Sequence, residues 1–121
     1  MNKIYCRLKP SLIENAGVGV FAIDVIPSGV DPFPGSETNV AIMSNDAYKS
    51  LSEEKQKMIR DFCYNNRGNW GVPNFNKIDI SWYVNSSENP NLSFDSSTGN
   101  YTTLREIKIG EELTYDYLIY D

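Results

Sequence analysis

Short apolar runs separated by turn-forming residues fill the first third of the chain, which is the pattern of small β-sheets. Residues 17–22 predict a turn of small residues that leads into an apolar strand. Residues 26–29 contain Pro27 and Gly29 and predict a second turn. Residues 30–38 carry two further prolines and a glycine, so the same reasoning predicts irregular chain there.

One longer helix is predicted at residues 52–64, where apolar residues recur at helical spacing. Either Ser50 or Ser52 can cap its first turn. A shorter helix is predicted at residues 46–51, and the Asn-rich residues 65–69 are predicted to end the longer helix and to form a loop. The spacing predicts one buried face that is made of Leu51, Met58, Ile59 and Phe62.

Apolar and polar residues alternate after the helical insert, which predicts strands. Strands are expected at residues 78–82, 91–94 and 101–107, and residues 95–100 are expected to form a turn. A final strand is expected to place Leu113, Tyr115 and Tyr117 on one face. The chain is therefore predicted to be mainly β with a short helical insert, in one domain over residues 1–121.

Composition removes several classes of chemistry. The chain of 121 residues contains no histidine and two cysteines, Cys6 and Cys63. This excludes Ser-His-Asp and Cys-His catalysis, His-based metal sites and four-cysteine zinc sites, so no metal is expected. The formal net charge of −5 argues against direct nucleic-acid binding through phosphates and favours a basic partner.

The sequence also bears on localisation. No apolar run approaches the ~18 residues of a membrane-spanning helix, and residues 1–7 lack the apolar core of a signal peptide. We therefore expect no membrane association and an intracellular protein with reduced cysteines. For a bacterial protein this means the cytoplasm. The sequence does not exclude a location in a host cell or in a nucleus.

Two segments stand out by their chemistry. Residues 85–91 are dense in polar groups although apolar strands are predicted on both sides. Taken alone, this segment is typical of a solvated turn. Residues 110–117 contain Tyr115 and Tyr117, which taken alone are typical of packing between strands.

Four motifs in this order resemble those of the SET-domain family of protein lysine methyltransferases, over about residues 4 to 118. Residues 17–22 are similar to the family's G-x-G-[VL]-F-A segment, and residues 26–29 to its I-P-x-G turn. Residues 85–91 are similar to N-H-S-x-x-P-N, with Ser86 in place of the histidine. Residues 110–117 match G-E-E-L-T-[FY]-D-Y without a change, and this motif is the most specific of the four.

The resemblance implies the SET-domain (β-clip) fold, in which the C-terminal segment lies under the Asn-rich loop as a pseudoknot. It implies S-adenosylmethionine as the cofactor, bound on one face, while the substrate lysine enters from the opposite face through a narrow channel. Cofactor contacts are expected from Asn85, from the backbone of Ser86 and from Tyr117. Further contacts are expected from the backbone of the glycine turn, which comprises Ala16, Gly17, Val18 and Gly19.

By its match to the last motif, Tyr117 is expected to be the catalytic tyrosine, with its hydroxyl near the transferred methyl group. Transfer to nitrogen is an in-line displacement that needs alignment and a neutral lysine more than it needs an acid, so the lack of histidine is no obstacle. Tyr115 stands at the family's Phe/Tyr switch. A tyrosine hydroxyl there can hold a water beside the amine, which predicts mainly monomethylation.

The sequence therefore predicts an intracellular protein-lysine N-methyltransferase that acts on a lysine-bearing, basic protein. A catalytically weak or inactive SET-like binding module is the alternative, because Ser86 lacks the imidazole that packs inside the pseudoknot in the family. The cysteines of the zinc-binding segment that closes the lysine channel in many members are missing. The insert around residues 40–77, a second subunit in a homodimer or the substrate itself is expected to complete the channel.

Overall fold

The computed structural model describes residues 3–36, 40–63, 65–95 and 97–117. The chain divides into two compact units, which are treated separately below. Unit 1 combines residues 1–37 with residues 79–121, and unit 2 comprises residues 38–78. The expectation of irregular chain at residues 30–38 holds for residues 30–36, where no helix or strand forms. Residues 37 and 38 lie outside the described residues.

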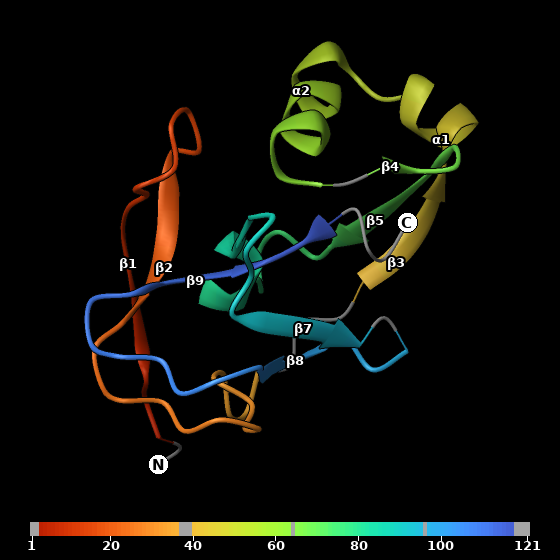
Figure 1. The fold of residues 1–121 in the computed structure, drawn as a ribbon. Helices are drawn as coiled ribbons and strands as arrows, with labels where there is room; N and C mark the ends of the chain where they lie inside the picture. The colour runs from red at the N-terminus through yellow and green to blue at the C-terminus, as the bar shows by residue number, and fades with distance from the viewer. Residues whose placement is uncertain (1–2, 37–39, 64, 96, 118–121) are drawn as a thin grey trace. The chain divides into compact units, whose positions relative to one another are not determined.

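Unit 1 is built from two small sheets (Figure 1). The larger has the strand order β1-β2-β9-β6 and contains β1 (Cys6–Pro10), β2 (Val18–Ala22), β9 (Glu112–Tyr115) and β6 (Asn85–Ser86). Its first three strands are antiparallel, and β6 pairs with β9 in parallel. The smaller sheet is the hairpin of β7 (Leu92–Asp95) and β8 (Asn100–Thr103). The predicted strands at residues 18–22 and 91–94 are therefore confirmed.

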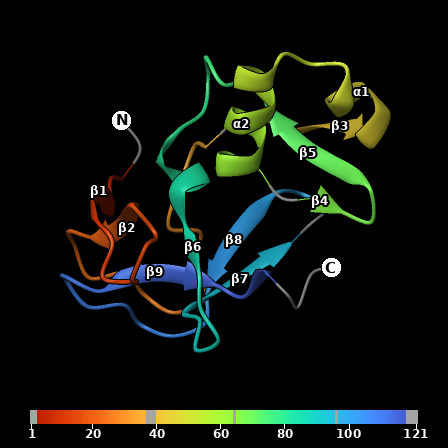
Figure 2. The same ribbon diagram turned by 90° about the horizontal axis from the view of Figure 1, so that it is seen from above.

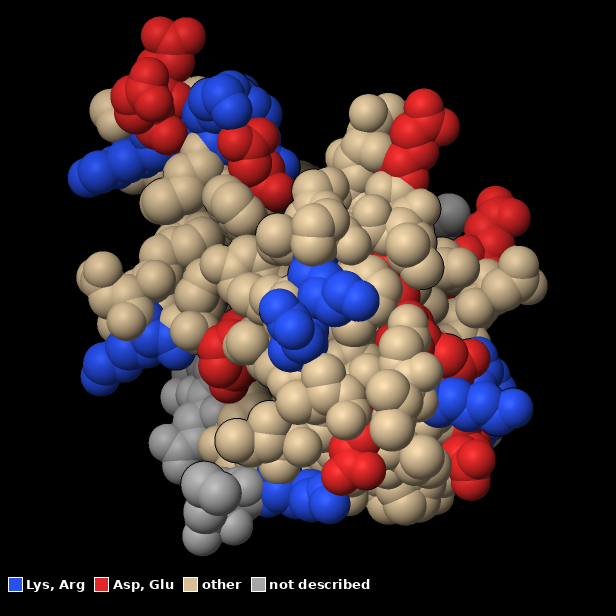
Figure 3. Space-filling view, turned by 90° about the vertical axis from the view of Figure 1, so that its left-hand side faces the viewer, with Lys and Arg blue, Asp and Glu red and all other residues tan. Residues whose placement is uncertain are grey.

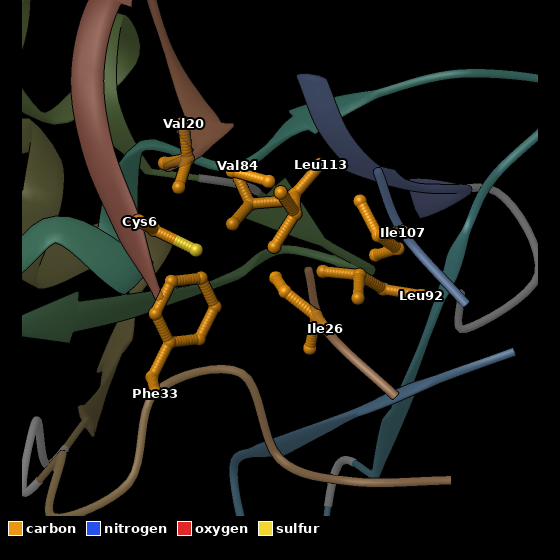
Figure 4. Close-up of a cluster of buried hydrophobic side chains, with 9 residues drawn as sticks. Cys6, Val20, Ile26, Phe33, Val84, Leu92, Ile107 and Leu113 are labelled. Atoms are coloured by element: carbon orange, nitrogen blue, oxygen red, sulfur yellow. The ribbon is translucent and has the colours of Figure 1, made fainter. Parts of the chain in front are cut away.

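The core of unit 1 gathers apolar side chains from segments that are distant in the sequence. Val20, Ile26, Ile107 and Leu113 are each completely buried. Figure 4 shows the labelled side chains of this cluster converging from the strands and from the turn at residue 26. Burying such a side chain contributes about 1.5–3 kcal/mol, so this cluster fixes how the strands pair.

The predicted strand at residues 78–82 is wrong at its centre, because a 3-10 helix, η1, forms at Ile80–Tyr83. Asp79 caps this helix: its carboxylate accepts hydrogen bonds from the backbone N–H and the hydroxyl of Ser81. An Asp side chain that bonds to the backbone two residues on favours a turn over a strand. The alternation of apolar residues at 78–82 does not reveal that this bond competes with strand formation.

Two predicted strands are shorter than expected. β8 ends at Thr103 and does not reach Ile107, which instead forms an isolated bridge with Ile26. β9 ends at Tyr115, so Tyr117 lies beyond the strand. The prediction that one strand carries Leu113, Tyr115 and Tyr117 is therefore wrong for Tyr117.

Unit 2 contains a three-stranded antiparallel sheet and both α-helices. Its strands are β3 (Val40–Ser44), β4 (Asn65–Asn66) and β5 (Asn69–Pro73), in the order β3-β5-β4. The short helix is α1 (Asn45–Lys49), and the longer helix is α2 (Glu53–Phe62). Both predicted helices are confirmed, and Ser52 caps α2 by accepting a hydrogen bond from the Lys55 N–H.

The predicted apolar face of α2 is only partly buried. Ile59 is 3% exposed, whereas Met58 and Phe62 are 36% and 47% exposed. Phe62 makes an edge-to-face contact with Phe75, with ring centroids 6.4 Å apart, a separation that such pairs prefer. Helical spacing therefore identified the helix correctly but overestimated how much of it is buried.

Acidic and basic side chains are interspersed on the face of the molecule that Figure 3 shows. The net charge of −5 is thus not gathered into a single acidic patch on the face in view.

No helix within the described ranges combines the length and the apolar character needed to cross a membrane.

Candidate functional site

The two motifs singled out by their chemistry lie against each other in unit 1. β6 pairs in parallel with β9, which sets Asn85 beside Thr114 and Ser86 beside Tyr115. In the view of Figure 2 the chain at β6 crosses β9 near the end of its arrow. Beyond the strand, the Ser87 N–H donates to the Tyr115 carbonyl over 3.0 Å. The Asn-rich loop and the C-terminal segment are joined in this way, as the expected pseudoknot requires.

Asn91 ties the two segments together from a buried position, with 4% of its surface exposed. Its side-chain oxygen accepts from the Thr114 N–H over 2.9 Å, and its Nδ2 donates to the Glu112 carbonyl over 2.9 Å. Its own backbone N–H donates to the Thr114 carbonyl over 3.2 Å. The side-chain amide of Asn91 thus bonds to the backbone of β9 in the way that a neighbouring strand would.

The glycine turn closes the β1–β2 hairpin. Gly17 has a φ of +71°, which an L side chain rarely adopts, and a Cβ placed there would meet nothing within 4 Å. The Gly17 carbonyl accepts from the Ser11 N–H over 2.8 Å, which fixes the width of the loop. Because Gly17 and Val18 are exposed, their backbone can be approached by a ligand.

Asn85 connects this turn to the C-terminal segment. Its Nδ2 donates to the Val18 carbonyl over 3.0 Å and to Oε2 of Glu112 over 3.2 Å. Both donations use the nitrogen of the amide, so its oxygen lies on the other side, as an acceptor. The structure thus brings the predicted cofactor residues of the glycine turn and of the Asn-rich loop into direct contact.

Sequence reasoning missed Glu112. Its half-buried carboxylate accepts from the Ser11 hydroxyl over 2.8 Å and from the Leu12 N–H over 3.0 Å, in addition to Asn85. The signal that could have identified Glu112 is its place in the doublet Glu111-Glu112 directly before Leu113. Successive side chains in a strand point to opposite faces, so the residue before a core leucine faces away from the core. Its partners could not be identified from the sequence, because Ser11 is 101 residues away.

Tyr117 lies just beyond β9 and is held by two hydrogen bonds. Its hydroxyl donates to the Val84 carbonyl over 2.7 Å, and its backbone N–H donates to Oγ of Ser86 over 3.1 Å. Burial raises the pKa of the Tyr117 phenol to about 12. The phenol therefore stays protonated at neutral pH.

Tyr115 and Tyr117 belong to an aromatic cluster, whose members are Phe33, Phe94, Tyr101, Tyr115 and Tyr117. The Tyr115 and Tyr117 rings are 4.6 Å apart, and the Tyr115 and Tyr101 rings are 5.2 Å apart. The pKa of Tyr101 is raised well above its ordinary value, chiefly by burial and further by its neighbours Tyr115 and Tyr117. The Tyr101 and Tyr115 rings meet edge to face.

Ser86 is integrated into this arrangement through its hydroxyl. The substitution Ser86→Ala removes the acceptor for the Tyr117 N–H and is expected to lower the free energy of unfolding by about 1 kcal/mol, the usual net value of one hydrogen bond. Urea unfolding measures this change. Ser87→Ala, on the adjacent residue, is the comparison, because it removes the acceptor for the Asn89 N–H at an exposed place. A Ser86→Ala protein as stable as the wild type would show that serine merely fills the place of the family's histidine.

A depression of about 250 Å³ lies elsewhere in unit 1. It is lined by residues 3–6, 32–36 and 79–80, none of which belongs to the two motifs. Within the described ranges, no group of three or more His, Cys, Asp or Glu side chains is placed to hold a metal ion. The glycine turn, the Asn-rich loop and β9 meet at a different place in unit 1.

Comparison with solved structures shows the same fold in known proteins. The autoinhibited Chaetomium thermophilum Polycomb Repressive Complex 2 bound to S-adenosylmethionine matches with a TM-score of 0.64 and 21% identity. A humanized mutant of that complex bound to the inhibitor GSK126 matches with a TM-score of 0.64 and 23% identity. Each match covers 96% of this chain but 15% of the other, so the chain spans a small part of those proteins' length.

A Plasmodium falciparum protein named as a candidate histone methyltransferase has a similar size, since the match covers 96% of this chain and 95% of that one. Its TM-score is 0.57 and its identity 15%, so this likeness, like the two above, shows the fold alone. No curated protein matches the chain. The family model described as the SET domain matches residues 17–118, which include all four motifs, and the chain therefore belongs to the SET domain family.

Proposed function

We propose that this protein is a protein-lysine N-methyltransferase that transfers a methyl group from S-adenosylmethionine to a lysine side chain, mainly once per lysine. The observation that carries the proposal is membership of the SET domain family, whose members are typically S-adenosylmethionine-dependent protein-lysine methyltransferases. The proposal takes residues 1–121 as one SET domain with a core at about residues 4–118. A basic protein is the proposed substrate, because the chain carries a net charge of −5.

The residues at the meeting point of the motifs fit S-adenosylmethionine. The exposed backbone at Gly17 leaves room for a ligand, and the side-chain oxygen of Asn85 is an acceptor suited to the cofactor's ammonium group. We assign binding to Ala16, Gly17, Val18 and Gly19 of the turn, together with Asn85, the Ser86 backbone and Tyr117. When bound, the cofactor supplies an electrophilic methyl group on a positively charged sulfur.

The aromatic cluster supplies the environment that the lysine needs. An ammonium group does not attack a methyl group, so the substrate lysine has to lose its proton first. Removal from water disfavours the charged form of an amine and lowers its pKa. Tyr115 and Tyr117 line up with Phe94 in an aromatic environment that excludes water from an amine placed beside them.

The hydroxyl of Tyr117 is suited to accept rather than to donate. Its single proton is used on the Val84 carbonyl, so any further partner of this oxygen has to be a donor. The N–H groups of a neutral lysine amine are such donors, and accepting from one of them aims the nitrogen lone pair away from the tyrosine. Tyr117 therefore aligns the amine for an in-line displacement.

Tyr115 is proposed to set the number of methyl groups added. Tyr115→Phe is expected to shift the product from monomethyl-lysine to di- and trimethyl-lysine, because it removes the hydroxyl that holds a water in the space of a second methyl group. Mass spectrometry of a methylated peptide, at matched substrate conversion, measures the shift. Abundant trimethyl-lysine from the wild type would contradict the assignment.

Tyr101 provides a second variant for this experiment. Because its ring packs against that of Tyr115, Tyr101→Phe changes the surroundings of the Tyr115 hydroxyl without removing it, and a smaller shift is expected. Tyr5→Phe, at a half-buried tyrosine outside the cluster, is the control and should leave the product pattern unchanged. An active Tyr115→Phe protein with the wild-type pattern would remove Tyr115 from this role.

The proposed activity is tested with S-adenosylmethionine carrying a labelled methyl group. The protein is incubated with lysine-rich proteins, including basic ribosomal and DNA-associated proteins, and label is located by peptide sequencing in a mass spectrometer. Transfer to a lysine side chain is the expected result. Cofactor binding by calorimetry without transfer to any substrate would favour a SET-like binding module, and absence of cofactor binding would contradict both functions.

A further inference from the structure

We propose that Glu112 is a positioning residue of the cofactor site, which holds the glycine turn and the amide of Asn85 in one fixed arrangement. This inference rests on the proposed function, because it concerns how the same site is organised. Glu112 lies on β9, whereas the groups it binds come from the β1–β2 hairpin and from β6. One carboxylate therefore connects the three segments that form the site.

The partners of the carboxylate are all donors. Oε1 accepts from the Leu12 N–H over 3.0 Å, and Oε2 accepts from the Ser11 hydroxyl over 2.8 Å. Oε2 also accepts from Nδ2 of Asn85 over 3.2 Å. An ionised carboxylate is the one side-chain group that accepts on both atoms and donates on neither. A glutamine would turn an NH₂ group toward at least one of these donors.

The second glycine of the turn is explained by this carboxylate. A Cβ at Gly19 would overlap Oε2 of Glu112 and would lie 3.3 Å from Nδ2 of Asn85. Gly19 is buried, unlike Gly17, so its missing side chain makes room for Glu112. Glycine is therefore required at the two positions of the motif for different reasons. Gly17 adopts a left-handed φ at an open position, and Gly19 leaves the space beside the backbone that the Glu112 carboxylate occupies.

Glu112 also decides which way the Asn85 amide faces. The two ends of a primary amide are similar in shape, so its orientation depends on its hydrogen bonds. Acceptors at Val18 and Glu112 hold the NH₂ end on the protein side, which turns the oxygen outward. A reversed amide would present its NH₂ group to the cofactor's ammonium and repel it. Loss of Glu112 should therefore weaken binding through Asn85.

The experiment compares Glu112→Gln with the wild type by calorimetry with S-adenosylmethionine. Glu112→Gln is expected to weaken affinity about tenfold, which corresponds to about 1.4 kcal/mol. Glu111→Gln is the matched control one residue away. Its carboxylate binds Arg105 and the Lys108 N–H instead, so affinity should stay within about twofold of the wild type. Equal affinities for Glu112→Gln and the wild type would overturn the proposal.

A double-mutant comparison separates positioning from a merely structural role. If Glu112 acts through Asn85, then Glu112→Gln should reduce affinity by less than about threefold in an Asn85→Ala background. Full tenfold losses in both backgrounds would overturn the positioning role. Should Glu112→Gln fail to fold, Ser11→Ala removes a single donor and is expected to weaken affinity about threefold. Unchanged affinity in that variant would overturn the proposal.

A measurement on the free protein keeps this inference separate from the proposed function. In nuclear magnetic resonance spectra, Glu112→Gln is expected to shift the side-chain amide signals of Asn85 and to speed hydrogen exchange at the Leu12 N–H. Unchanged signals at both would overturn the role of Glu112, whatever the wild type binds. Shifted signals in a protein whose wild type binds no S-adenosylmethionine would support the contacts and refute the proposed function.

Discussion

Turnover by the Tyr117→Phe protein is expected to fall about 100-fold or more, the usual loss for one preorganised group that acts on the transition state. The loss corresponds to about 2.7 kcal/mol in the activation free energy. The reason is geometric: in the proposed mechanism the Tyr117 oxygen, held by its bond to the Val84 carbonyl, is the acceptor that aligns the amine. Single-turnover kinetics with labelled cofactor measure the change directly.

The same substitution also removes the hydrogen bond to Val84, which is expected to lower the free energy of unfolding by about 1 kcal/mol. Affinity for S-adenosylmethionine and the melting temperature are therefore measured beside the rate. Tyr5→Phe is the control, at a half-buried tyrosine outside the aromatic cluster. Turnover within a few-fold of the wild type in a folded Tyr117→Phe protein would show that Tyr117 is not catalytic.

Because burial raises the pKa of Tyr117 to about 12, its protonation does not change between about pH 6 and pH 10. A group whose pKa is raised stays protonated until the pH reaches the raised value. A rise of the rate with pH in this range is therefore not expected from Tyr117, and under the proposed mechanism it is expected from deprotonation of the substrate lysine. The proposed mechanism thus needs no acid-base group from the protein, which agrees with a chain that contains no histidine.

The parts of the fold that sequence reasoning predicted depend on local patterns. Gly17 and the apolar residues after it predicted β2, and Ser52 with helical spacing predicted α2. The contact between residues 85–91 and 110–117 was expected from the resemblance to the family, because no local pattern carries it. The parallel pairing of β6 with β9 joins residues that are about 30 positions apart.

The parts that escaped prediction depend on contacts between distant residues or on a competing local bond. Asp79 binding Ser81 converted an alternating segment into a 3-10 helix. Glu112 belongs to a motif that the sequence analysis identified, but its partners Ser11 and Leu12 come from the far end of the chain. A side chain's role in a site follows from such partners, which spacing along the sequence does not provide.

Asn91→Ala is expected to lower the free energy of unfolding by about 2–4 kcal/mol. The asparagine is 4% exposed and bonds the Thr114 N–H and the Glu112 carbonyl, so its removal leaves two backbone groups of β9 without these partners. Each buried group left unsatisfied costs about 1–3 kcal/mol. Such a loss is a large part of the stability of a small domain. Urea unfolding followed by circular dichroism measures it.

Asn91→Asp tests the direction of the two bonds. The aspartate keeps an acceptor for the Thr114 N–H but turns a second oxygen toward the Glu112 carbonyl, so it is expected to be at least as unstable as Asn91→Ala. Asn89→Ala, at an exposed position of the same loop, is the control and should change the free energy of unfolding by less than about 0.5 kcal/mol. If Asn91→Ala were as stable as this control, the side chain of Asn91 would not be what joins the Asn-rich loop to β9. The parallel pairing of β6 with β9 would then have to hold the two segments together without it.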